Sequence, residues 1–172
     1  MSVNVSKDIL NDPTKTVKAG ELITSGIPLT ISAAVDAFIG QLKLPVGTSK
    51  IYGIALFDQN AYRNQVTDTT GGLYGSGKGT VEIQGIVEVG RTVYHAPDGT
   101  PTNVDVYDTS KTYAYLEKVG IAVVALPLPV GNVPLISNNP DNTASIFGIV
   151  VGIPTDASLG TPLQILLIPN NA

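Results

Sequence analysis

The sequence predicts an all-β fold, a small β-barrel or sandwich. Short β-branched runs alternate with Gly and Pro along most of the chain, which is typical of strands joined by turns. The clearest run, residues 81–89, carries valine or isoleucine on one face and Glu82, Gln84 and Glu88 on the other. Helical periodicity is rare, and its best candidate, residues 31–39, fits either about two turns of helix or an extended segment.

The remaining elements follow from the same pattern. Residues 96–99, Ala-Pro-Asp-Gly, form a strong turn signal. Glycines inside the expected strands weaken them unless the backbone bends sharply or approaches another chain closely. We therefore expect corners or bulges at Gly53, Gly85, Gly120 and Gly148. Further strands are expected at residues 17–24, 50–57, 92–95, 103–107, 112–117, 119–126, 146–151 and 163–168.

The length of 172 residues fits one domain with an arm. Residues 1–16 are polar and without periodicity, so we expect a flexible or partner-bound N-terminal arm. Residues 17–172 are expected to form a single β domain with long loops. Loop or subdomain insertions are expected within it at residues 59–79 and 127–145.

Charge is scarce, at 14% of residues against about 25% in an ordinary soluble domain. After residue 118 only Asp141 and Asp156 are charged, and seven of the twelve prolines lie there. Such sheet edges aggregate unless a partner covers them, so this region is expected to contact other protein chains.

The same numbers argue against two classes of partner. The net charge of −4 disfavours nucleic acid, which requires clustered Lys and Arg. The longest uncharged apolar stretch, residues 119–136, contains Pro127, Pro129 and Pro134, which would break a membrane helix. The N-terminus has no basic start or apolar core of a secretion signal, so synthesis in the cytoplasm is expected.

Catalytic and metal motifs are incomplete. Residues 72–79 match a phosphate-binding loop up to Lys78, but Gly79 replaces the Mg²⁺-binding Ser or Thr and a strand pattern follows. His95 is the only histidine and there is no cysteine. Three aspartates that could be considered for calcium, Asp98, Asp105 and Asp108, lack a recognised spacing. We expect no enzyme activity, no cofactor and no metal.

Four tyrosines gather around one expected hairpin region: Tyr94, Tyr107, Tyr113 and Tyr115. Such rings form an interface or stack on sugars, or they pack across strands within the sheet, and the sequence leaves both open. The residues expected to bind a partner are Val3, Val5, Ile9, Tyr94, Tyr113, Tyr115, Leu128 and Val130.

The ordered motifs at residues 17–26, 52–58, 81–94, 147–151 and 163–168 resemble the head decoration, or cement, proteins of tailed bacteriophages. The resemblance covers most of residues 17–168. It implies a tulip-like barrel with an extended N-terminal arm, commonly trimeric on the capsid, and no enzyme activity. The insertion at residues 59–79 and the Pro-rich stretch at 127–140 are longer than the compact pattern of that family.

The resemblance implies a virion structural protein, made in the host cytoplasm, that binds the outer surface of an icosahedral capsid and stabilises it. Its partners would be the major capsid protein and further copies of itself, with a homotrimer favoured, and neither nucleic acid nor membrane. Two alternatives stay open: a carbohydrate-binding or adhesion module that uses the tyrosines, and another virion subunit of the tail or minor capsid.

Overall fold

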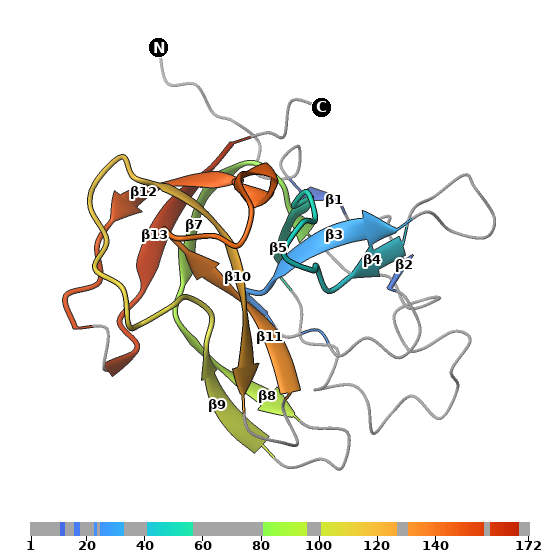
Figure 1. The fold of residues 1–172 in the computed structure, drawn as a ribbon, viewed down its shortest axis with the longest axis horizontal. Helices are drawn as coiled ribbons and strands as arrows, with labels where there is room; N and C mark the ends of the chain where they lie inside the picture. The colour runs from blue at the N-terminus through green and yellow to red at the C-terminus, as the bar shows by residue number, and fades with distance from the viewer. Residues whose placement is uncertain are drawn as a thin grey trace.

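The structure, a computed structural model, describes residues 11–12, 16–17, 23, 25–32, 41–56, 81–95, 101–126, 131–156 and 159–168. Within these ranges the chain forms strands, turns and short 3-10 segments such as Thr143–Ser145. The predicted all-β fold class is therefore confirmed. Figure 1 shows a curled sheet and a second sheet beside it, with a long hairpin below.

The curled sheet has five strands in the order β11-β10-β12-β13-β7, and every neighbouring pair is antiparallel. Its longest pairing joins β10 to β11, from Gly120 opposite Ser137 to Leu126 opposite Gly131. The strand bounds are Gly85–Val89 for β7, Lys118–Leu126 for β10, Gly131–Ser137 for β11, Gly148–Gly152 for β12 and Leu163–Leu167 for β13.

The second sheet has six short strands in the order β1-β6-β5-β3-β4-β2, and only the β2–β4 pair is parallel. Its bounds are Asn11–Asp12 for β1, Thr16–Val17 for β2, Pro28–Ser32 for β3, Gln41–Lys43 for β4, Gly53–Ala55 for β5 and Val81–Glu82 for β6. It has a small core of its own, made of Ile23, Leu29, Leu42, Ala55 and Val81.

The hairpin of β8 (Arg91–His95) and β9 (Pro101–Asp105) leads into the segment that closes the curled sheet. Val106, directly after β9, donates its N–H to the carbonyl of Gly90, which follows β7. The Val106 carbonyl accepts from Ile136 on β11, and Asp108 donates back to the Ile136 carbonyl. Because Val106 joins the β7 side to the β11 side at Gly90, the curled sheet becomes a small barrel that is closed at this point, while β7 itself stays the last strand of the sheet.

The barrel encloses the main core. Side chains from all five strands and from the closing segment meet there, including the rings of Tyr107 and Tyr113. The members buried most deeply include Val89, Tyr107, Val119, Ile121, Ile136, Val150, Leu163 and Ile165.

The predicted strand at residues 81–89 is wrong as one continuous element. It divides into β6 and β7, which belong to different sheets. Gly85 has a φ of +115° at this break, a backbone region that residues with a Cβ rarely adopt. As a result Glu82, expected on the wet face, is only 6% exposed.

At Gly120 a glycine is needed because of close packing. A Cβ on it would lie 2.8 Å from both the Pro140 Cβ and the Ser145 Oγ. The expected bend is therefore confirmed at Gly85, while Gly120 permits a close approach within this chain. The register shift of the sheet lies elsewhere, between Val150 and Gly152.

The strand predicted at residues 112–117 is also wrong. Residues 115–116 form a turn and residues 112–114 form no regular element, because the Glu117 N–H donates to the Ala114 carbonyl while the Glu117 carboxylate accepts from the Ala114 N–H. These two bonds close the turn across Tyr115 and Leu116.

Strand β11 was not predicted, because it lies in the Pro-rich stretch. Pro134 stands opposite Val123 of β10, and the Val123 N–H points the other way, to the Asp141 carboxylate at 2.8 Å. The pair therefore needs no hydrogen bond from Pro134. A proline is tolerated in a sheet where its missing N–H faces outward.

Several predictions fall partly outside the described residues. Residues 31–32 of the helix candidate belong to β3, and 33–39 are not described. Of the predicted arm, Asn11–Asp12 and Thr16–Val17 pair with β6 and β4. The insertion at 59–79 and residues 127–130 are not described.

Gly120→Ala is expected to destabilise the fold by about 1–3 kcal/mol, because the new methyl group overpacks the contact with Pro140 and Ser145. The urea midpoint of unfolding measures this. Ala125→Ser, at an exposed position of the same strand, is the control and should leave the midpoint unchanged. Equal midpoints for both variants would contradict the close packing.

Candidate interaction surface

The turn at residues 114–117 displays two large apolar side chains. Tyr115 is 67% exposed and Leu116 is 77% exposed. Leu116 has a φ of +66° and is the only described residue other than glycine with a positive φ. A bulky side chain in this region costs about 1–2 kcal/mol relative to its usual conformation, so the turn retains a strained and exposed leucine.

Apolar side chains, half-buried Ile149 and exposed Leu166 and Ile86, lie on the strands of the curled sheet next to this turn. The Leu116 N–H donates to the Val150 carbonyl of β12. Ile149 of β12 pairs with Leu166 of β13, which pairs with Ile86 of β7. Partners in register share one face. We call Leu116, Ile149, Leu166 and Ile86 the apolar row.

The row lies on the outside of the barrel. Ile86 is 64% exposed and Leu166 is 39% exposed, whereas Val87 and Ile165, one position along each strand, belong to the core. Single exposed hydrophobic residues are ordinary. Here three exposed residues, Leu116, Leu166 and Ile86, and the half-buried Ile149 lie on adjacent elements, and such a grouping is typical of a contact surface.

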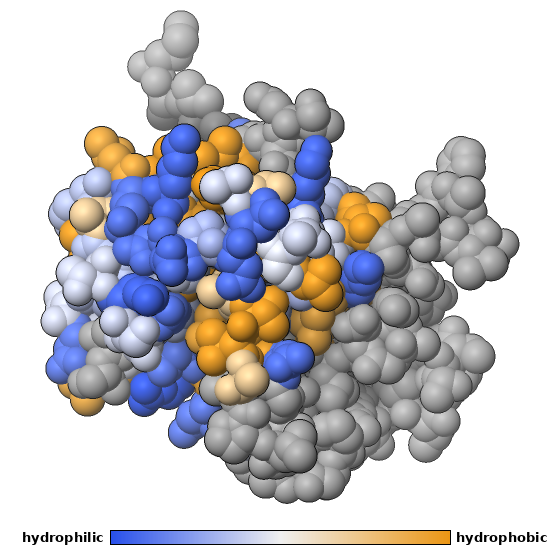
Figure 2. Space-filling view, in the orientation of Figure 1, coloured by the Kyte–Doolittle hydropathy of each residue, from blue (hydrophilic) through white to orange (hydrophobic). Residues whose placement is uncertain are grey.

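Polar side chains border the row. Lys118 stands next to Ile149 in register, and Gln164 donates to the Glu88 carboxylate at 2.6 Å. An apolar centre with a polar rim is the usual arrangement of protein interfaces. Figure 2 shows the same alternation on the face it displays, where hydrophobic patches are bordered by hydrophilic residues.

The four tyrosines do not form one surface. Tyr113 is only 4% exposed, and its ring packs edge-on against Tyr107 with centroids 5.7 Å apart. Its hydroxyl donates to the carbonyls of Asp108 and Ile136, while the Tyr107 hydroxyl donates to the Thr161 carbonyl at 2.7 Å. The rings of Tyr107 and Tyr113 therefore pack inside this chain and are not part of an exposed interface.

The structure thus separates Tyr113 from Tyr115, which sequence analysis placed in one partner-binding set. Tyr115 remains a candidate contact. The Tyr94 side chain and the other candidates, Val3, Val5, Ile9, Leu128 and Val130, lie outside the described residues.

Sequence analysis missed Leu116, Leu166 and Ile86. One signal was available, because Ile86 occupies a polar position of the alternating run at residues 81–89. Leu116 gave no such signal, since nothing local indicates a positive φ for a leucine.

Burial raises the pKa of the Tyr113 hydroxyl, and the nearby Asp108 charge raises it further. Burial is also the largest cause of the raised pKa of Tyr107. Both hydroxyls therefore keep their protons to a higher pH than an unperturbed tyrosine does.

The aspartates considered for calcium have other partners. The Asp105 carboxylate accepts from the Arg91 guanidinium at 2.9 Å, and the Asp108 carboxylate accepts from the Ser110 hydroxyl at 2.6 Å. Asp98 is not described. In the described ranges no three His, Cys, Asp or Glu side chains gather as metal ligands would.

Comparison with known proteins gives no further assignment. No family model, curated protein or solved structure matches the chain. In the part of the chain that the structure describes, no helix has the length and apolar character needed to cross a membrane. The functional argument therefore depends on the surface itself.

Tyr113→Phe is expected to cost about 1 kcal/mol at neutral pH, because two carbonyls lose a donor. In the unfolded chain a tyrosine deprotonates near pH 10, whereas folded Tyr113 keeps its proton. The unfolded state then binds fewer protons, so stability falls as the pH rises above about 10. The Tyr113→Phe variant does not lose stability in this way. The difference in unfolding free energy between the parent protein and the variant should therefore narrow between pH 9 and 11.

Urea unfolding at several pH values measures this gap. Tyr115→Phe removes an exposed hydroxyl and should retain the alkaline loss of the parent protein. A gap that stays constant up to pH 11 would contradict a buried and protonated Tyr113.

Leu116→Asn is expected to stabilise the protein by about 1 kcal/mol, because asparagine tolerates a positive φ better than leucine. Thermal unfolding measures the change. Leu159→Asn is the matched control, since Leu159 is 73% exposed and its φ is not positive. Destabilisation by Leu116→Asn would show that the leucine stabilises the isolated chain.

Proposed function

We propose that this chain is a non-catalytic structural subunit of a virion, which binds the outer surface of an icosahedral capsid and stabilises it. The observation that supports a role in assembly most strongly is the apolar row with Leu116 at its end. The assignment to a capsid follows from the resemblance of the sequence to phage head decoration proteins.

The strain at Leu116 supports a contact role. Asparagine or glycine would fit the turn with less strain, and an exposed leucine contributes little to the stability of an isolated chain. A partner that buries Leu116 would recover free energy at about 25 cal/mol per Å² of apolar surface. Strain retained at an exposed residue is typical of a functional position.

The barrel supports the proposal through its rigidity. The row lies across three hydrogen-bonded strands, and the core packs directly beneath it. Preorganised side chains lose little entropy on binding. A subunit that must hold a shell together benefits from such a surface, since the contacts require no rearrangement.

Of the alternatives, a carbohydrate-binding module loses support. It would stack sugars on Tyr113 and Tyr115 together, and Tyr113 is buried in the core. A tail or minor capsid subunit would use the same apolar row, and the number of copies per particle would distinguish it from a decoration protein.

Purified protein is expected to bind heads assembled without it and to raise their thermal stability. Leu116→Asn should weaken this binding about tenfold or more, because the most exposed apolar contact of the row is lost. Co-sedimentation and the melting temperature of the heads measure both effects. The same variant is expected to stabilise the isolated chain, so a loss of binding could not be attributed to unfolding.

Leu159→Asn is again the control and should bind heads like the parent protein. Failure of the parent protein to bind or stabilise the heads would overturn the proposed function. Full binding by Leu116→Asn would place the contact away from the apolar row.

A further inference from the structure

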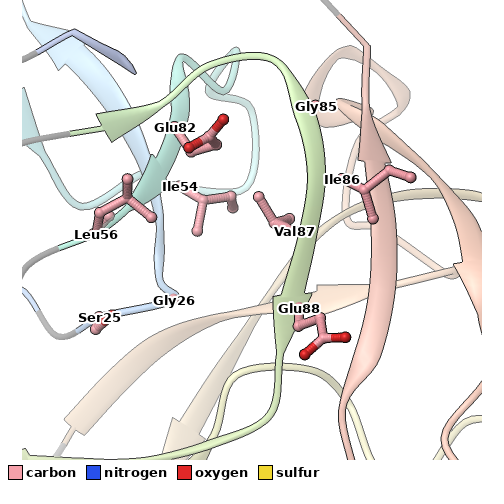
Figure 3. Close-up of a pocket in the computed structure, with 10 residues that line it drawn as sticks. Ser25, Gly26, Ile54, Leu56, Glu82, Gly85, Ile86, Val87 and Glu88 are labelled. Carbon is pink, nitrogen blue, oxygen red and sulfur yellow. The ribbon is translucent and has the colours of Figure 1, made fainter. Parts of the chain in front are cut away.

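A groove of about 330 Å³ lies where the two sheets meet, between β7 on one side and residues 25–26 and 54–56 on the other. Figure 3 shows Ile54 and Val87 next to each other in it, with Leu56 on the β5 side. Leu56 is 43% exposed, so the groove presents apolar surface to its surroundings.

The groove runs along an open strand edge. β7 is the last strand of the curled sheet, so the N–H and C=O of every second residue of β7 point away from β13. The Gly90 carbonyl points to Val106 on that side, and the alternation assigns Glu88 and Ile86 to the same side. Between the described residues no backbone hydrogen bond is formed there by Ile86 or Glu88.

Such an edge is a template for an added strand. The groove beside it would receive the side chains of that strand. An extended segment that pairs with Ile86 and Glu88 would therefore gain both backbone hydrogen bonds and apolar contact.

The charge of the groove selects the segment. Among the residues that the structure describes, its lining includes Glu82 and Glu88 and no basic side chain. The Glu88 carboxylate accepts a hydrogen bond from a neutral amide, Gln164, so its charge is not neutralised there. A strand with a lysine beside Glu88 complements this charge.

One segment of this chain has the required pattern. Residues 2–10 read Ser-Val-Asn-Val-Ser-Lys-Asp-Ile-Leu. In an extended strand Val3, Val5, Lys7 and Ile9 share one face. With that face on the outside of the barrel and Lys7 beside Glu88, the side chain beside Ile86 is Val5 in a parallel pairing and Ile9 in an antiparallel one.

We propose that residues 2–10 of a second copy of this chain add to β7 as an extended strand, with Lys7 beside Glu88. The placement of β1 favours a second copy. β1 and β5 flank β6 on opposite sides, and the groove is on the β5 side. Asn11 of β1 therefore lies across β6 from the groove of its own chain.

The exchange goes beyond the proposed function, because it requires only that copies associate, whether or not they bind a capsid. Each copy provides one segment and one β7 edge. The contact is heterologous, and it closes as a reciprocal dimer or as a ring such as a trimer.

A charge exchange between positions 7 and 88 tests the proposal on the full chain. Lys7→Glu and Glu88→Lys should each weaken self-association about tenfold or more, because like charges then meet at the contact. An equal mixture of the two variants should restore association, since every contact of a mixed dimer, and two of the three contacts of a mixed trimeric ring, join a segment to a groove of opposite charge. Sedimentation velocity over a micromolar concentration series measures both effects.

Lys111→Glu, at an exposed loop position, is the control and should associate like the parent protein. A monomeric parent protein, single variants that associate normally, or a mixture that stays dissociated would each overturn the proposal. The last result would indicate that the segment binds its own chain. Binding of the parent protein to heads is measured separately, so failure of the strand exchange and failure of capsid binding are distinguishable.

Discussion

The hydrogen bonds of Val106 are the constraint on which the barrel depends. One backbone N–H reaches the chain after β7 and one carbonyl reaches β11, so a single residue joins the two ends of a five-stranded sheet. Without this link the core would be open along one side, because the sheet itself is only a curled half-barrel. The buried Tyr107 and Tyr113 then secure the closing segment, since their hydroxyls bond to the carbonyls of Thr161, Asp108 and Ile136.

This closure also determines where the apolar surface lies. After Tyr113 has entered the core, the chain has only the turn at residues 114–117 in which to reverse and begin β10 at Lys118. Tyr115 and Leu116 are at the tip of that turn, so they are directed outward by the same element that buries Tyr113. The exposed leucine is thus a consequence of a tight connection between the closing segment and the sheet, where its N–H donates to the Val150 carbonyl.

Sequence analysis predicted the fold class because alternation and turn signals are local properties. It failed where the outcome depended on residues distant in the chain. The break in residues 81–89 depends on which sheet each half joins, and the alternation is the same for either. Pro134 indicated a loop, but its place opposite Val123, whose N–H is bound by Asp141, makes a strand possible. Tyr113 and Tyr115 share one face in a strand, and only the turn between them places one inside and the other outside.

The two proposed contacts meet at β7, and their geometry makes them compatible. Ile86 ends the apolar row on β7, the open edge of the curled sheet. A strand added at that edge would continue the sheet. Its outward side chain beside Ile86, Val5 or Ile9, would extend the row by one further apolar residue. Self-association would then enlarge the surface available for a capsid, and apolar contact grows with the area buried. Charge is scarce in such a surface because each uncompensated charge buried between subunits would oppose assembly. The low charge of the chain after residue 118 is consistent with an outer face that is buried in the assembly.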